Sequence, residues 1–409
     1  MKYIYLFFAV GITLVIGTIN LRLLSPAPEY PERREEIILQ LNYLEAELKQ
    51  KDLGGRMQGI FPEGYVFVHA LYGLSWAEVA LASPQDKDIQ VRAAVEALYA
   101  YQALDSERGK STFSDYLKPQ YGIFYAGWKN YLLGKLLSLN SPVEKEKHLK
   151  KAFINQCEAV AKALQEANSP FLQSYHGQAW PADMFLAMAS LAIHDKLYPP
   201  KYQAVIQQWL NKVKDNLDPE TGLLPHRVEA NTGKTLESAR GGSLTLMLRL
   251  LAEIDPSFGK QQYALFKDNF LSTALGLLMV REYPTGTDGV GDVDSGPVIM
   301  GVGFPATIVS IGTFFIYGDE ELSKTQYQIV HAFGFGVSHG GEKKYLFGLL
   351  PMADAFIAWS RATNIRIENE ASEEEPPGTF LFLFIFLLIV LIIWYFYYRK
   401  YVKNSTALP

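Results

Sequence analysis

The hydrophobic pattern divides the chain into two long apolar ends and a helical middle. Residues 3–19 are uncharged and apolar, and residues 380–398 consist almost wholly of Phe, Leu, Ile, Val, Trp and Tyr. About 20 such residues are enough to cross a bilayer as a helix. We therefore expect an N-terminal anchor in 1–22 and a transmembrane helix at 380–398. The first run resembles a signal peptide, but no small-x-small cleavage site follows it, which favours an uncleaved anchor.

The flanks of the second apolar run predict its orientation in the membrane. An acidic stretch at 373–375 precedes the run, and Arg399, Lys400 and Lys403 follow it. Basic flanks of transmembrane helices stay in the cytoplasm. We therefore expect the basic tail 399–409 in the cytoplasm and the region between the two spans outside it.

Two linkers are expected to separate the spans from one domain. The first covers 23–35 and is rich in proline, and the second covers 368–379 and is acidic with two prolines. The domain is then 36–367. An uncharged run at 297–318 is long enough to be a third span, but glycine, proline, serine and threonine dilute it, so a buried core helix is favoured.

Within the domain, two kinds of helical segment alternate. Amphipathic segments carry one apolar stripe and so bury one face; they are 31–50, 86–104, 144–167, 199–216 and 256–274. The other segments are apolar nearly all round, and such helices are buried on every side. They are 64–82, 121–139, 181–194, 241–253, 303–317 and 350–360, of which 241–253 is intermediate in character.

This alternation predicts an all-α fold, an (α/α)6 toroid with an inner ring of buried helices inside an outer ring of amphipathic ones. We expect six inner and five outer helices, with 31–50 pairing with the last inner helix to close the ring. A small β-hairpin is expected in 218–238, where Asp-Pro, Thr-Gly and Asn-Thr-Gly are turn signals. The alternative is an irregular helical array or solenoid, although no fixed-period repeat is present.

Composition excludes several classes of function. The net charge is −5 and Lys and Arg are not clustered, which argues against nucleic-acid binding. Cys157 is the only cysteine, so the chain has no intrachain disulfide. His-Glu-x-x-His and Gly-x-Ser-x-Gly are both absent, so neither a zinc site nor a hydrolase elbow is indicated. We expect no metal and no cofactor.

In such a toroid all inner helices run in the same direction, so the loops before them meet at one mouth. Helix N-termini present free N–H groups and partial positive charge there. On this basis Glu63 and Glu237 are also expected at the mouth. The candidates for substrate binding are Tyr121, Tyr125, Trp128, Trp180, Arg240, Glu282, Tyr283 and His339.

Three acids and one histidine are the candidates for catalysis. Asp183 follows Trp180-Pro181 in the first turn of an expected helix, where a carboxylate also stabilises the helix dipole. Asp292 and Asp294 lie in a Gly-rich loop; Asp294 also suits an N-cap, whereas no cap accounts for Asp292. His176 lies in a loop beside aromatic residues. Paired carboxylates supply a general acid and a general base.

The pattern resembles the six-hairpin toroid enzymes, which include glycoside hydrolases and unsaturated-glycan hydrolases. More distantly, Trp180-Pro-Ala-Asp183, the 218–223 stretch Asp-Pro-Glu-Thr-Gly-Leu and the 292–297 stretch Asp-Val-Asp-Ser-Gly-Pro resemble linalool dehydratase-isomerase-type toroids. Those enzymes use cysteines near the catalytic Asp and His, whereas Cys157 here falls in an amphipathic outer helix. That departure counts against isoprenoid chemistry.

Three functions follow from these features as alternatives. The first is a membrane-anchored extracytoplasmic enzyme that acts on an oligosaccharide in a central cavity by carboxylate and histidine acid–base catalysis. The second is a non-catalytic scaffold of a membrane complex that binds a glycan or lipid. The third is a terpenoid or lipid dehydratase-isomerase-like enzyme. In each case the lipid bilayer is a partner through the two terminal helices.

Overall fold

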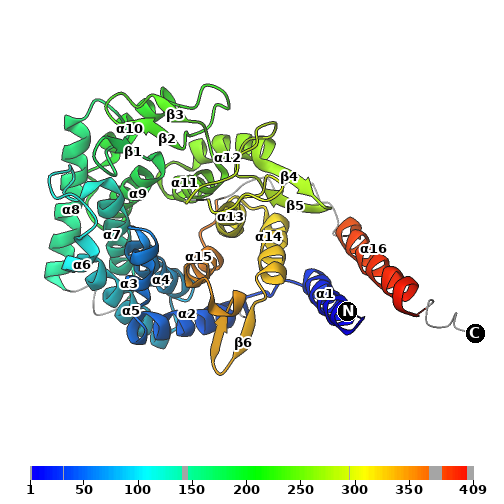
Figure 1. The fold of residues 1–409 in the computed structure, drawn as a ribbon. Helices are drawn as coiled ribbons and strands as arrows, with labels where there is room; N and C mark the ends of the chain where they lie inside the picture. The colour runs from blue at the N-terminus through cyan, green and yellow to red at the C-terminus, as the bar shows by residue number, and fades with distance from the viewer. Residues whose placement is uncertain (1, 31, 141–145, 294, 368–379, 403–409) are drawn as a thin grey trace, which may run out of the picture.

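The computed structural model describes residues 2–30, 32–140, 146–293, 295–367 and 380–402. The predicted linker 368–379, most of the basic tail and Asp294 lie outside the described residues. Figure 1 shows a ring of helices with two further helices beside it.

Six helices form a closed inner ring. Each inner helix packs against the next one in the chain, and the last packs against the first. They are α4 (Gly64–Leu81), α7 (Gly122–Leu137), α9 (Pro181–Leu197), α11 (Gly241–Ile254), α13 (Phe304–Ile316) and α15 (Pro351–Ala362). Because the last-to-first contact closes the ring, the predicted toroid is confirmed and the open solenoid is excluded.

Outer helices cover the ring and return the chain from one inner helix to the next. They are α2 (Glu32–Gln50), α5 (Lys87–Asp105), α8 (Lys147–Glu166), α10 (Gln203–Lys214), α12 (Pro256–Phe270) and α14 (Glu320–Phe333). Helix α2 packs against α15 and α4, so the expected closure by the first domain helix is confirmed.

Local sequence explains why these helices begin where they do and which face they bury. In α8, Leu149, Phe153 and Cys157 are buried at intervals of four residues, which places them on one face. Asp86 caps α5 by accepting a hydrogen bond from the N–H of Ile89. Asp255 caps α12 in the same way, and Pro256 opens that helix.

Several elements differ from the sequence expectation. Helix α14 was not assigned, because its buried face includes the polar residues Ser323 and Gln326. The expected helix 256–274 ends at Phe270, and its last residues form strand β4 (Leu271–Ala274), paired with β5 (Leu277–Val280). Two short helices, α3 (Leu53–Ile60) and α6 (Glu107–Lys110), and the hairpin of β6 (Val337–His339) and β7 (Glu342–Lys344) were also not predicted.

A three-stranded antiparallel sheet bridges two neighbouring inner helices. Strand β1 (Gln178–Ala179) precedes α9 and pairs with β2 (Arg227–Glu229), which pairs with β3 (Thr235–Glu237) before α11. The expected hairpin in 218–238 is therefore present as β2 and β3. The sheet links the loops at the starts of α9 and α11.

Charged side chains fill the interior of the ring near the C-terminal ends of the inner helices. Lys135 lies 2.9 Å from Glu253 and 3.4 Å from Glu78, and the Glu78 carboxylate lies 3.7 Å from Arg249. All four side chains are nearly inaccessible to solvent. Two cations face two anions, so this buried network is neutral and closes the ring opposite its mouth.

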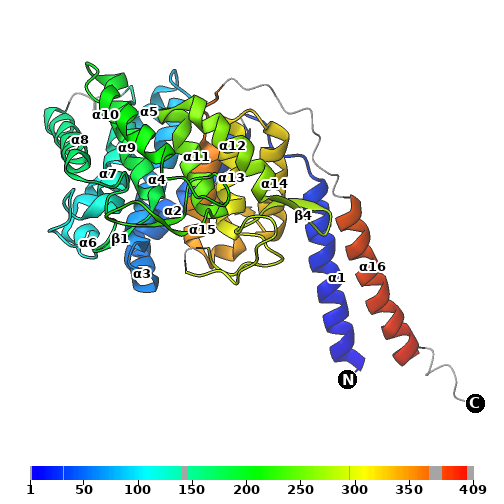
Figure 2. The same cartoon turned by 90° about the horizontal axis from the view of Figure 1, so that it is seen from above.

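Two helices are long and apolar enough to cross a membrane, Lys2–Leu24 (α1) and Leu383–Val402, which overlaps α16 (Phe380–Tyr397). They lie side by side (Figure 2): the Tyr5 hydroxyl donates to the carbonyl of Ile393, and the Trp394 indole donates to Thr13. The uncharged run at 297–318 contains α13, which is too short to span and is buried in the ring. The core-helix interpretation is therefore confirmed.

Candidate active site at the mouth of the ring

The mouth is the end of the ring at which the N-termini of the inner helices lie. Trp180 is the N-cap of α9, and Arg240 is the N-cap of α11. Neither side chain caps its own helix, so both are available to the surrounding loops. Two groups of polar side chains form around these positions.

The first group, the arginine cluster, consists of Arg240, Glu282, Asp292 and His226. The buried Arg240 guanidinium donates through Nε to Glu282 at 2.8 Å and through its two terminal nitrogens to Asp292, at 3.1 Å in the longer bond. A bidentate arginine fixes a carboxylate in orientation as well as position. Asp292 keeps an exposed side, since 45% of its side chain is accessible.

The surroundings of Arg240 set the charges of its neighbours. Burial raises the pKa of Glu282, although Arg240 opposes that change. Burial, together with the nearby Arg240 charge, lowers the pKa of His226 to about 3. His226 is thus neutral, and its Nδ1 is hydrogen-bonded to Ser243. The cluster holds one cation and two acids and so tends toward negative charge.

The second group, the aspartate cluster, consists of Asp183, Ser174, Tyr175, Trp180 and Glu63. Asp183 lies in the first turn of α9 and is 8% exposed. It accepts a hydrogen bond of 2.5 Å from the Ser174 hydroxyl. The next residue, Tyr175, donates to Glu63 at the start of α4 and meets Trp180 edge to face at 5.9 Å. The group thus combines two carboxylates with two aromatic rings.

A solvent-open hollow of about 510 Å³ adjoins the aspartate cluster. Phe113, Tyr116 and Tyr121 provide its aromatic lining. Phe113 stacks on Tyr175 at 5.9 Å, and Tyr116 meets the exposed His176 edge to face at the same distance. The hollow, with Tyr121 in its lining, therefore lies beside Tyr175 and His176, in the loop that leads into α9 and Asp183.

The sheet connects the two clusters. Ala179, next to Trp180, pairs with Val228, and Arg227 pairs with Glu237, three residues before Arg240. Glu237 also lies 3.9 Å from both His226 and Arg240. Both clusters therefore lie at the mouth, at the starts of neighbouring inner helices.

Of the remaining predicted site residues, three lie outside the two clusters and one lies beside Arg240. Tyr125 is buried and its hydroxyl donates to the carbonyl of Leu104, and Trp128 is fully buried against Phe67. Neither ring offers a surface to a ligand in this structure, so we leave both out of the proposed site. Tyr283 lies under Arg240, 5.3 Å from its guanidinium carbon. His339 is exposed on the β6–β7 hairpin, which packs against α2 at the ring's perimeter.

Sequence reasoning missed Ser174, Tyr175 and His226 as site residues. Ser174 and Tyr175 come before the turn that precedes α9, and only the fold reveals that they face Asp183 and Glu63. The signal that was available is their position beside His176 in an aromatic loop. In the described part of the chain, no group of three or more His, Cys, Asp or Glu side chains is arranged to hold a metal ion.

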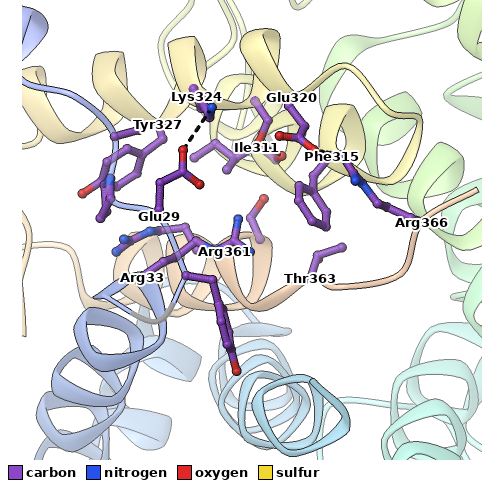
Figure 3. A pocket seen from close by; sticks show the side chains of 15 residues that line it. Glu29, Arg33, Ile311, Phe315, Glu320, Lys324, Tyr327, Arg361, Thr363 and Arg366 are labelled. Carbon is purple, nitrogen blue, oxygen red and sulfur yellow. Dashed lines mark hydrogen bonds and ion pairs between the residues drawn. The ribbon is translucent and has the colours of Figure 1, made fainter. Parts of the chain in front are cut away.

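A separate cavity of about 180 Å³ lies at the other end of the ring (Figure 3). Its charged lining is mainly basic, with Arg33, Lys324, Arg361 and Arg366, against Glu29 and Glu320. Lys324 pairs with Glu29 at 3.1 Å. The residues that line this cavity come from the C-terminal halves of α13 and α15, from the first turns of α14 and α2 and from the segment before α2, so it is distinct from the mouth.

Comparisons with known proteins concern the fold alone. No protein-family model and no curated protein matches the chain. Similar solved structures include a selenomethionine derivative of a GH76 alpha-mannanase from Bacteroides thetaiotaomicron, with 11% identity, 73% of this chain and 84% of that chain covered, and a TM-score of 0.43. A family 105 glycoside hydrolase from C. acetobutylicum ATCC 824 has 15% identity, 77% and 98% coverage, and a TM-score of 0.44.

These similarities are too distant to carry a functional argument. The closed ring of helices is established independently, by the contacts between helices within this chain. The likeness to linalool dehydratase-isomerase-type proteins is not among these findings and stays a prediction.

Proposed function

We propose that this protein is a membrane-anchored enzyme that acts on a glycan by acid–base catalysis at the mouth of the ring. The observation that carries the proposal is Asp183, a buried carboxylate at the start of an inner helix, next to Trp180 and to an open aromatic hollow. Aromatic rings offer the flat apolar faces on which sugar rings pack. A carboxyl group held beside such rings is placed to exchange a proton with a bound sugar, as acid–base catalysis requires.

Asp292 is the proposed partner of Asp183. Arg240 holds both oxygens of Asp292 and so fixes the orientation of that carboxylate. Asp183 would protonate the leaving oxygen of a glycosidic bond while Asp292 removes a proton from the attacking water. His176 and Tyr121 would contact the sugar from the hollow, and Tyr283 would support Arg240.

The proposed topology places the ring outside the cytoplasm and both termini inside. Arg399 and Lys400 follow α16, and basic residues on that flank stay in the cytoplasm. With two antiparallel spans, Lys2 then also lies in the cytoplasm. The substrate is accordingly a glycan of the cell surface or its surroundings.

A binding protein without catalytic activity is the second candidate. Ser174 already engages Asp183, and Arg240 already engages Asp292, which suits carboxylates that stabilise the loops. In that case the aromatic hollow would still bind a sugar.

The test is turnover of a glycan panel by the full-length protein in detergent. Neutral, acidic and unsaturated uronate-terminated oligosaccharides are incubated with it, and product release is followed by chromatography. Turnover of one class, with loss of turnover in Asp183→Asn, is the expected result. Binding of a glycan by both proteins with turnover by neither would instead support the binding protein.

A further inference from the structure

Large apolar side chains are exposed in the loops that precede α13 and α15. We call them the apolar rim; its members are Val290, Val293, Ile299, Met300, Phe347, Leu349 and Leu350, which are 51–89% exposed. The two helices that these loops precede are neighbours in the ring, and large apolar side chains exposed together are typical of an interaction surface. Because α13 begins at Phe304 and α15 at Pro351, the rim lies at the mouth of the ring.

Helix α1 is attached to the ring at the same end. Ile19 and Leu23, near its C-terminus, pack against Ile329 and Ala332 of α14 and Leu277 of β5. Ile329 and Ala332 lie near the C-terminus of α14, which returns the chain toward the mouth. The start of α16 joins this contact through Leu383 and Phe386.

Aromatic contacts connect α1 to the rim. The Arg22 guanidinium lies 5.8 Å from the centre of the Phe335 ring, and Arg22 donates to the carbonyl of His331 at 3.0 Å. Phe335 in turn stacks on Phe347 of the rim, with ring centres 6.3 Å apart. The rim is therefore continuous with the ring-proximal end of the first span.

The length of α1 fixes where the bilayer ends. Its 23 residues, Lys2–Leu24, rise by about 34 Å at ~1.5 Å per residue, against a hydrocarbon core of about 30 Å. The outer boundary of the bilayer then falls close to Arg22 and Leu23, beside Phe335. Figure 2 shows α1 and α16 running from the ring toward the side on which β1, α3 and α6 lie, which is the mouth side.

We propose that the apolar rim rests in the outer surface of the bilayer, so that the mouth faces the membrane. The substrate is then a glycan carried by the membrane, such as a lipid-linked one; this substrate class rests on the proposed function. The loop 286–303 carries Asp288, Asp292 and Asp294 and no Lys or Arg. Before α15, Lys343 is buried against Glu36 and Lys344 lies 5.7 Å from the Tyr43 ring of α2. Contact with the bilayer therefore depends on apolar burial and is insensitive to salt and to anionic lipid.

Fluorescence quenching in lipid nanodiscs tests this placement with the full-length protein. An environment-sensitive fluorophore is attached to single cysteines introduced as Ile299→Cys and Leu349→Cys. The native Cys157 is completely buried and is accounted for by labelling the unmodified protein. Phe7→Cys on the exposed face of α1 is the positive control, and Gln85→Cys, between α4 and α5 at the opposite end, is the negative control.

Lipids with a spin label in the upper acyl region should quench the fluorophores at positions 7, 299 and 349 and leave position 85 unquenched. Raising the salt concentration should not change the result. Quenching at position 7 without quenching at 299 and 349 would overturn the proposal while leaving membrane anchoring intact. Absence of quenching at position 7 would overturn the anchoring and the proposal together.

Activity gives an independent readout of the same proposal. Leu349→Ser with Leu350→Ser makes the rim polar without touching either cluster. Turnover of a membrane-borne glycan should fall at least tenfold, and turnover of the matching water-soluble oligosaccharide should not change. An equal loss on both substrates would contradict a role in bilayer contact, and equal retention on both would contradict it as well.

Discussion

At the scale of single residues, Arg240 determines the geometry of one half of the mouth. It is 4% exposed and joins Glu282, which is equally buried, to Asp292, which reaches solvent. Its position as N-cap of α11 is visible in the sequence, and so is its need for an acidic partner. Which acids it binds depends on loops more than 40 residues away, so only the fold identifies Glu282 and Asp292.

Replacing Arg240 by Met should destabilise the protein by about 3–5 kcal/mol, because Glu282 keeps its buried charge and loses its partner. Chemical denaturation measures this cost. Adding Glu282→Gln should recover part of the loss. Arg108→Met, which breaks the exposed pair with Asp52, is the matched control and should cost about 1 kcal/mol or less. Equal costs for the two arginines would show that Arg240 is not needed to neutralise Glu282.

Asp354 gives a residue-scale prediction of pH dependence. Burial raises its pKa from 3.8 to about 7, while Tyr345 N–H and Gln40 act in the opposite direction. Between those two values the folded state binds a proton that the unfolded state does not. The free energy of unfolding therefore falls as the pH rises through that window.

Asp354→Asn should remove this contribution and flatten the stability profile between pH 4 and pH 7. The amide oxygen can still accept the hydrogen bonds from Gln40 and Tyr345. Denaturation at a series of pH values compares the two proteins. If the free energy of unfolding of the variant changes with pH as steeply as that of the unmodified protein, the titrating group is not Asp354.

At the scale of elements, the position of Asp183 depends on how closely α7 approaches α9. A Cβ added to Gly127 of α7 would lie 2.9 Å from the Asp183 carbonyl oxygen and 3.2 Å from the Leu186 Cβ. Glycine is therefore required by the contact between two inner helices at the level of the site. Sequence patterns do not reveal such a requirement, because they identify a buried helix and not its neighbour.

Gly127→Ala should push α7 away from α9, with a cost of about 1–3 kcal/mol from overpacking. The same displacement moves Asp183, so turnover should fall more than stability alone explains. Gly59→Ala in α3 is the control, since nothing lies within 4 Å of an added Cβ there. It should be neutral or slightly stabilising. Thermal melts and turnover rates are measured for both; normal turnover in Gly127→Ala would contradict the argument.

The elements that sequence patterns predicted best are the inner helices. Their segments are apolar on all sides, which is a property of burial that local sequence records directly. The segments missed are those with mixed patterns. Helix α14 buries Gln326, and β6 is exposed along its length. In these elements tertiary contacts outweigh local preference.

At the scale of the whole molecule, ring closure and membrane attachment both join distant parts of the chain. Helices α15 and α4 meet across nearly 300 residues, and α1 meets α16 across the whole chain. Alternation of segment types predicted the ring. It could not predict that α1 docks on α14 and β5, because an apolar helix shows no preferred face when all its sides are apolar.

The topology can be tested with the intact chain. A C-terminal reporter that is active only outside the cytoplasm should be silent, because the proposed topology, based on Arg399 and Lys400, places that end in the cytoplasm. The same reporter inserted at Gln85, on the surface of the ring, should be active and serves as the control. An active C-terminal reporter would reverse the orientation and place the ring in the cytoplasm.

The most direct test of the proposed acid–base catalysis is the turnover rate of full-length Asp183→Asn on a glycan that the unmodified protein turns over. Asparagine keeps the shape of the side chain and can still accept the Ser174 hydrogen bond, but it cannot transfer a proton. The rate should fall by about 10²-fold or more, with little change in melting temperature. Full activity in this variant, with the fold intact, would contradict acid–base catalysis by Asp183.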